Sequence, residues 1–134
     1  MSISVIPEAF QDLFSDKRAF AHLATVMADG SPQVTPVWFA YDGEYIIVNS
    51  AVGRVKDRNM KRDGRVALSI QDPDNPYRYI QVRGNVVDIT TQGADDSIDQ
   101  LAFKYLGKER YPGRRASETR VIYRIKPLTF TTMG

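Results

Sequence analysis

The chain has no cysteine and only one histidine among its 134 residues. Without cysteine it has neither disulfide bonds nor thiolate metal ligands, and it suits a reducing compartment, so we expect a cytoplasmic protein. A single histidine forms neither a metal site nor a nucleophilic triad, and we interpret His22 as a packed or solvent-edge side chain. The sequence also lacks HExxH, P-loop and GxGxxG motifs, so hydrolytic, metal-dependent and Rossmann-type functions have no support.

Long apolar runs and a strong excess of one charge are missing as well. No stretch approaches the ~20 apolar residues of a membrane span, and residues 1–18 lack the basic-then-apolar pattern of a secretion signal, so we expect no membrane association. The formal net charge of +2 is too small to require a polyanionic partner. We therefore expect no nucleic acid partner. The length predicts one domain, residues 1–134.

Alternating Val, Ile, Thr, Phe and Tyr residues predict a mainly β, antiparallel protein. The predicted strands cover residues 20–28, 33–41, 45–50, 66–70, 77–89, 120–125 and 128–132. Asp-Gly pairs at 29–30 and 42–43 are hairpin signals and predict that the first three strands form a meander. The adjacent pair Val86-Val87 predicts a bulge. Short helices are predicted after Pro7, over 53–63 and over 93–106. Six or seven strands with three short helices favour a small barrel whose ends are plugged by helices.

Positive charge is concentrated in residues 49–66, NSAVGRVKDRNMKRDGRV. At about 100° per residue, a helix here separates a basic face from a packed face. The basic face contains Arg54, Arg58, Lys61 and Arg65, with Arg62 at its margin, and the packed face contains Val52, Val55, Asn59 and Met60, with Lys56 among them.

Two of these cations suggest an anion site. A lysine on a packed face extends to solvent or meets a fixed anion, which applies to Lys56. Arg54, in the first turn, opposes the helix dipole unless an anion is bound there. With Ser50 and the free amides of residues 51–53, they form a candidate phosphate site. A solvated basic helix is the alternative interpretation, because charge runs are usually exposed faces.

Aromatic residues mark a second region. On the predicted strand 77–89, Tyr77 and Tyr79 share a face with Gln81 and Arg83, opposite Ile80, Val82 and Val86. A monomer would leave this polar-aromatic face exposed. Trp38 and Tyr123 are more typical of a core, and contact of Trp38 with a ligand is the less favoured alternative.

Three segments together resemble a known family. They are SPQVTPVWF, YIIVNSAVGRVKDRNM and RVALSIQDPDNPYRYIQVRG, punctuated by the Asp-Gly pairs. The chain resembles the pyridoxamine 5′-phosphate oxidase-like split-barrel flavoproteins from about Phe20 to Ile125. Within them it is most similar to the flavin/deazaflavin oxidoreductases that depend on coenzyme F420, on the strength of GRVKDRN and DPDNPYRY.

The resemblance implies an FMN-binding-like split barrel that forms a homodimer, with two cofactor sites at the subunit interface. It implies that Ser50, Arg54 and Lys56 hold the cofactor phosphate. Further implied positions are Thr35, Pro36 and Val37 along the tricyclic ring, with Tyr77 and Tyr79 approaching from the partner subunit.

Departures from the family pattern narrow the expected function. Pyridoxamine-phosphate oxidases have an arginine at the position of Thr35, a substrate-binding lysine at that of Ala40, and a C-terminal Arg-x-His segment that is missing from TFTTMG. The resemblance therefore implies hydride transfer from reduced F420 to a small conjugated acceptor, not pyridoxamine-phosphate oxidation. The additional basic residues Arg58, Lys61 and Arg62 would interact with the acidic tail of F420. An FMN-binding reductase or oxidase, and a non-enzymatic flavin- or tetrapyrrole-binding module, are the alternatives. No catalytic residue is assigned.

Overall fold

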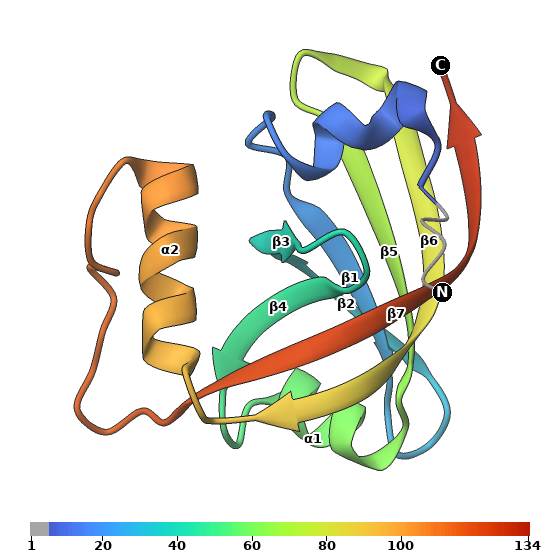
Figure 1. Ribbon diagram of the computed structural model, residues 1–134. Helices are drawn as coiled ribbons and strands as arrows, with labels where there is room; N and C mark the ends of the chain where they lie inside the picture. The colour runs from blue at the N-terminus through green and yellow to red at the C-terminus, as the bar shows by residue number, and fades with distance from the viewer. Residues whose placement is uncertain (1–5) are drawn as a thin grey trace.

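A computed structural model describes residues 6–134; residues 1–5 of the predicted domain lie outside the described part. The described strands form one antiparallel sheet of order β2-β1-β5-β6-β7-β4-β3. It curls so that its inner face encloses the core (Figure 1), and the predicted mainly β split barrel is confirmed. The strands are β1 (Ala21–Val26), β2 (Pro32–Val37), β3 (Phe39–Tyr41), β4 (Ile46–Ala51), β5 (Arg65–Asp72), β6 (Asn75–Thr90) and β7 (Arg120–Met133).

The predicted three-stranded meander is wrong, because segment 33–41 breaks at Trp38. β1 and β2 form one hairpin, and β3 and β4 form another. The free side of β1 then pairs with β5 and that of β4 with β7, so β2 and β3 lie at opposite edges of the sheet. Turn chemistry specifies each hairpin, whereas the break depends on these long-range pairings.

Two long strands, β6 and β7, join the halves of the sheet. The predicted bulge is confirmed. Val86 pairs with Ile125 and Asp88 pairs with Arg124, so Val87 is the extra residue of the bulge. The predicted strands 120–125 and 128–132 are one continuous strand. A second register shift lies beside Pro127, where the missing backbone N–H is tolerated.

Helices close the barrel. The 3₁₀ helix η1 (Glu8–Phe14) buries Phe10, Leu13 and Phe14, as their spacing predicts. At the other end, α1 (Val55–Arg62) lies against β1 (Figure 1) and buries Met60. The expectation that Val52 and Val55 pack is wrong, because they are 46% and 38% exposed. The reason is that α1 begins only at Val55, so Val52 lies outside the helix and Val55 is its first residue, ahead of the buried Asp57, Asn59 and Met60.

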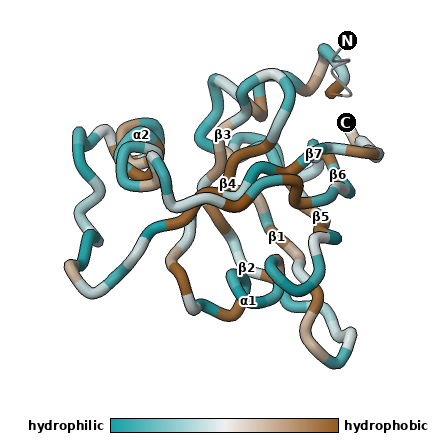
Figure 2. The backbone as a smooth tube through the Cα atoms, turned by 60° about the horizontal axis from the view of Figure 1, so that its bottom comes forward, coloured by the Kyte–Doolittle hydropathy of each residue, from teal (hydrophilic) through white to brown (hydrophobic). Residues whose placement is uncertain are grey.

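The helix α2 (Ala94–Leu106) stands beside the sheet and has a small core of its own (Figure 1). Ile98, Leu101 and Tyr105 pack there against Trp38 and Tyr111. As predicted, Gly107 ends the helix with a positive φ of 70°. The tube in Figure 2 is hydrophobic along the central strands and hydrophilic in the loop that follows α2. Within residues 6–134 no helix is long and apolar enough to cross a membrane.

Arg78 on β6 connects η1 to the β5–β6 hairpin. Its guanidinium lies 2.6 Å from a carboxylate oxygen of Asp12 and 2.9 Å from one of Asp72. Asp72 also accepts hydrogen bonds from the amide of Asp74, at 2.8 Å, and from Lys17, at 3.2 Å. The Asp74 amide, followed by Arg78 and Lys17, lowers the pKa of Asp72 to about 2. The ionised form of Asp72 is therefore stabilised in the folded state.

We predict that Asp72→Asn flattens the dependence of stability on pH. A carboxylate whose folded pKa is lowered contributes stability above its unfolded pKa of ~3.9 and loses it as the pH falls toward the folded value. Wild-type protein should thus lose stability between about pH 4 and pH 2 more steeply than the variant in urea melts. Asp16→Asn removes an exposed carboxylate nearby and should leave the profile unchanged. Parallel profiles for wild type and Asp72→Asn would contradict the prediction.

Candidate functional site

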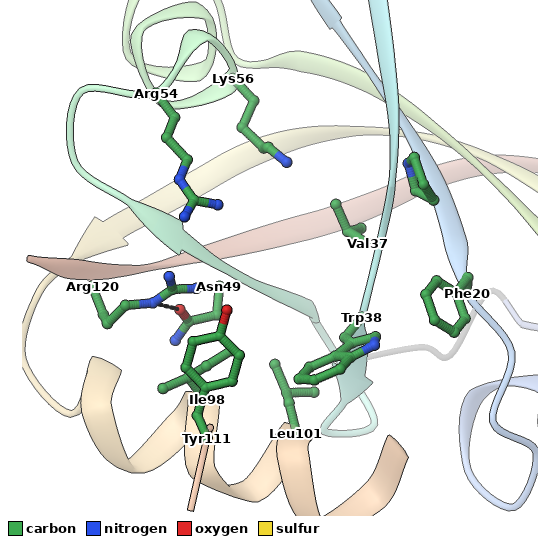
Figure 3. Close-up of a pocket in the computed structure, with 11 residues that line it drawn as sticks. Phe20, Val37, Trp38, Asn49, Arg54, Lys56, Ile98, Leu101, Tyr111 and Arg120 are labelled. Carbon is green, nitrogen blue, oxygen red and sulfur yellow. Dashed lines mark hydrogen bonds between the residues drawn. The ribbon is translucent and has the colours of Figure 1, made fainter. Parts of the chain in front are cut away.

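A pocket of about 220 Å³ lies where the start of α1, the strand break and α2 meet (Figure 3). Cationic side chains from the α1 start and from β7 form one end, and aromatic and aliphatic side chains form the other. The lining residues are Phe20, Pro36, Val37, Trp38, Asn49, Arg54, Lys56, Ile98, Leu101, Tyr111 and Arg120. The pocket thus joins an anion-attracting end to an apolar wall.

Asp57 organises the turn that leads into α1. Its buried carboxylate accepts hydrogen bonds from the Gly53 amide at 2.9 Å, the Tyr123 hydroxyl at 2.5 Å and Lys61 at 3.0 Å. Burial alone would raise the pKa of Asp57, but these three donors lower it overall. Gly53 has a φ of +93°, a conformation that favours glycine. Asp57 therefore sets the backbone from which Arg54 and Lys56 project.

Two of the three amides predicted to be free, those of Val52 and Gly53, are already bonded. The Val52 amide donates to the Thr119 carbonyl at 2.9 Å, and the Gly53 amide donates to Asp57. A backbone carbonyl and an internal carboxylate thus take two of the donors that a bound anion was expected to use. Side chains are therefore the main candidates to hold an anion in this pocket.

Two arginines at the cationic end share one carboxylate. Arg54 reaches Glu118 at 2.9 Å, and Arg120 reaches the other oxygen of Glu118 at 3.1 Å. Arg120 is buried and also donates from Nε to the Asn49 side chain at 2.9 Å, drawn as a dashed line in Figure 3. The guanidinium of Arg120 further lies 5.3 Å from the centre of the Tyr111 ring. Arg120 is consequently held on several sides.

Lys56 differs from both arginines, because within residues 6–134 no carboxylate lies within ion-pair distance of it. Its ammonium donates to Thr35 Oγ1 at 3.2 Å. Burial, and then repulsion from Arg54 and Arg120, lowers the pKa of Lys56. The predicted placement of Lys56 on the packed side is confirmed, and a negative charge in the pocket would favour its ionised form.

The aromatic end is centred on Trp38. Its ring stacks on Tyr105, with centroids 5.3 Å apart and planes 4° from parallel, and meets Tyr111 edge-on at 6.0 Å. Tyr105 is buried and donates its hydroxyl to the Ala19 carbonyl at 2.6 Å. Burial raises the pKa of Tyr105 to about 12. Trp38 is therefore both a core residue and part of the pocket wall.

The structure brings several of the predicted site residues together. Pro36, Val37, Arg54 and Lys56 line the pocket, and Thr35 contacts it through Lys56. Ser50 follows Asn49 in β4, so its side chain lies on the opposite face of the strand. The Ser50 hydroxyl is buried and has no hydrogen-bond partner within residues 6–134.

Other predicted residues lie elsewhere. Tyr77 is 75% exposed on β6 and Tyr79 is half-buried; neither lines this pocket. Arg58, Lys61 and Arg62 are exposed, as expected of a basic face. Arg65 belongs to β5 instead of α1 and pairs with Asp63 at 2.7 Å, because the helix ends at Arg62. His22 is exposed, in agreement with a solvent-edge side chain.

Sequence reasoning missed part of the site. The residues missed are Phe20, Asn49, Ile98, Leu101, Tyr111 and Arg120. Ile98 and Leu101 were recognised only as the apolar stripe of a helix, and Arg120 only as the first residue of a strand. No local spacing links these residues to Arg54, because strand pairing and the docking of α2 bring them together.

Comparison with known proteins places the chain in a family. The family model described as pyridoxamine 5′-phosphate oxidase matches residues 6–134. The chain belongs to this family. The predicted family is therefore confirmed over almost the whole sequence, and the curled antiparallel sheet is the fold that this family adopts.

Solved structures of the same fold extend the comparison. An F420 reductase is 38% identical, with a TM-score of 0.84 over 94% of this chain and 98% of the other. HupZ from Group A Streptococcus is 21% identical, with a TM-score of 0.68 over 95% and 93%. PhzG from Burkholderia lata is 16% identical, with a TM-score of 0.63 over 92% and 74%. The last two share the fold, whereas the first also supports the resemblance to F420-dependent members of the pyridoxamine 5′-phosphate oxidase family.

We predict that Tyr123→Phe destabilises the protein by about 1–3 kcal/mol, because the buried Asp57 carboxylate loses a hydrogen-bond donor. Urea unfolding followed by circular dichroism measures this change. Tyr77→Phe removes the same hydroxyl from a side chain that is 75% exposed and should change the free energy of unfolding by less than about 0.5 kcal/mol. Equal effects of the two substitutions would refute the structural role given to Asp57.

Proposed function

We propose that this chain is a deazaflavin-dependent oxidoreductase that transfers hydride from reduced coenzyme F420 to a small conjugated acceptor. One observation carries the proposal: a half-buried lysine, which has no carboxylate partner within residues 6–134, opens into a pocket whose far wall is aromatic and aliphatic. A cofactor with a phosphate at one end and a flat ring system at the other would match the cationic and aromatic ends of the pocket. The F420 reductase at 38% identity supports the same cofactor class.

The residues of the cationic end fit a phosphate group. Lys56 and Arg54 would contact it directly, and Arg120 would add a second guanidinium. We leave Ser50 out of the proposed set, because its side chain lies on the face of β4 opposite to Asn49 and away from this pocket. Metal ions have no part in the proposal, and no group of three or more His, Asp or Glu side chains in the described part of the chain could hold one.

The proposed ring site follows β2 and the strand break. Thr35, Pro36 and Val37 would line the ring, with Trp38 behind them. The reduced cofactor, when bound, supplies the hydride, and the protein supplies position and exclusion of water. The apolar side chains Ile98 and Leu101 limit access of water to that end of the pocket.

We further propose a cytoplasmic homodimer in which a partner subunit completes each site. The polar-aromatic face of β6 supports this arrangement, since Tyr77 is 75% exposed and Gln81 and Arg83 are exposed beside it. Tyr77 and Tyr79 would approach the cofactor bound by the other subunit. Sedimentation equilibrium should give twice the chain mass of 15.1 kDa, and a monomer at micromolar concentration would refute the dimer.

A competition titration tests the cofactor. F420 fluorescence should change on addition of the protein at micromolar concentrations, and FMN should displace F420 only at higher concentration. Protein that purifies with bound FMN and has no affinity for F420 would identify the flavin instead. Tight binding without turnover across enones, quinones and biliverdin would favour a non-enzymatic binding module.

We predict that Lys56→Ala weakens F420 binding by roughly 10- to 100-fold, the loss expected for one hydrogen bond to a charged group. The matched control is Arg65→Ala, because the Arg65 side chain is 76% exposed and already paired with Asp63; its effect should be less than about twofold. Fluorescence titration gives both dissociation constants. Equal effects would mean that the basic segment is only a solvated surface.

A further inference from the structure

Glu118 occupies an unusual position among the cations of the pocket. Its two carboxylate oxygens bind different arginines, Oε1 to Arg54 at 2.9 Å and Oε2 to Arg120 at 3.1 Å. The Glu118 side chain is only 18% exposed, so water screens these contacts weakly. The hydrogen bond from Arg54, and then that from Arg120, lowers the pKa of Glu118. Glu118 is therefore ionised at neutral pH.

The charges of this cluster can be counted. Arg54, Lys56 and Arg120 bring three positive charges, and Glu118 removes one of them. Both arginines already have a carboxylate partner, and Arg120 is also held by Asn49. Lys56 alone has no carboxylate partner within residues 6–134. The cluster thus keeps a net charge of +2: one charge is that of Lys56, and the other is shared by two arginines that already bind Glu118.

We propose that Glu118 determines which phosphate the pocket accepts, by favouring a phosphodiester with one negative charge over a phosphomonoester with two. This inference rests on the proposed function, because the phosphate of F420 is a diester and that of FMN is a monoester. The first negative charge is matched by Lys56. A second charge must compete with Glu118 for Arg54 and Arg120, and Glu118 repels it in a partly buried pocket.

The decisive variant is Glu118→Gln, which retains the shape of the side chain and removes its charge. Titrations at pH 8 keep a phosphomonoester doubly ionised, since its second pKa is ~6. FMN should bind about tenfold more tightly to the variant than to wild type, and F420 should gain no more than about threefold. Riboflavin, which has the ring but no phosphate, should bind both proteins equally. Equal gains for FMN and F420, or a gain for riboflavin as large as that for FMN, would overturn the proposal.

Two further variants separate charge from shape and position. Glu118→Asp keeps the charge and should retain the wild-type ratio of FMN to F420 affinity. Glu109→Gln removes an exposed carboxylate from the same loop and should also leave the ratio unchanged. Thermal melts establish that each variant is folded. A ratio that changes in Glu118→Asp as much as in Glu118→Gln would show that geometry, not charge, is responsible.

The role of Glu118 can be decided even if the proposed function fails. If wild-type protein binds neither F420 nor FMN, the cofactor proposal is refuted. Calorimetry with phenyl phosphate, a dianion at pH 8, and diphenyl phosphate, a monoanion, then replaces the titrations. Glu118→Gln should improve phenyl phosphate binding about tenfold relative to diphenyl phosphate. An unchanged ratio would overturn the inference on its own.

Discussion

The buried carboxylate of Asp57 is the interaction on which the rest of the site depends. It joins three parts of the chain: the turn at Gly53, the last turn of α1 through Lys61, and the first half of β7 through Tyr123. A buried charge is tolerated only where hydrogen bonds compensate for the loss of water. Asp57 has such bonds, so a satisfied polar group positions the start of α1 relative to the barrel, in addition to the packing of Met60 in the core.

The break at Trp38 has a comparable effect on the other end of the pocket. Because β2 and β3 pair with different neighbours, the chain crosses from one edge of the curled sheet to the other at this residue. The crossing leaves Trp38 outside the hydrogen-bonded ladder, where its ring stacks on Tyr105 of α2. The aromatic wall and the docking of α2 are therefore consequences of one topological constraint.

Local chemistry made much of this architecture predictable. Asp-Gly turns, a helix that ends at Gly107 and the bulge at Val87 all follow from short-range rules, and each is present. The edges of the sheet were not predictable, since the period of a strand specifies its two faces but not its neighbours. The same reason explains why Lys56 was recognised and Arg120 was not. Lys56 is a charged residue on the otherwise packed face of its helix, and this exception is visible in the sequence. Arg120 begins a strand, as many polar residues do, and its place beside the pocket follows only from the pairing of β4 with β7.

A buried charge and a half-buried charge on one short helix differ in whether the fold alone explains them. Asp57 and Lys56 are neighbours, yet Asp57 has donors for both of its carboxylate oxygens, whereas within residues 6–134 Lys56 has only the Thr35 hydroxyl. A satisfied buried charge is explained by folding alone. A cation whose pKa is lowered by burial, and which has no carboxylate partner within residues 6–134, weakens the folded protein unless a ligand compensates for it. A charge that the fold partly buries and leaves without a compensating partner is typical of binding sites. The contrast explains Asp57 by the fold and supports the proposed role of Lys56 in binding a ligand.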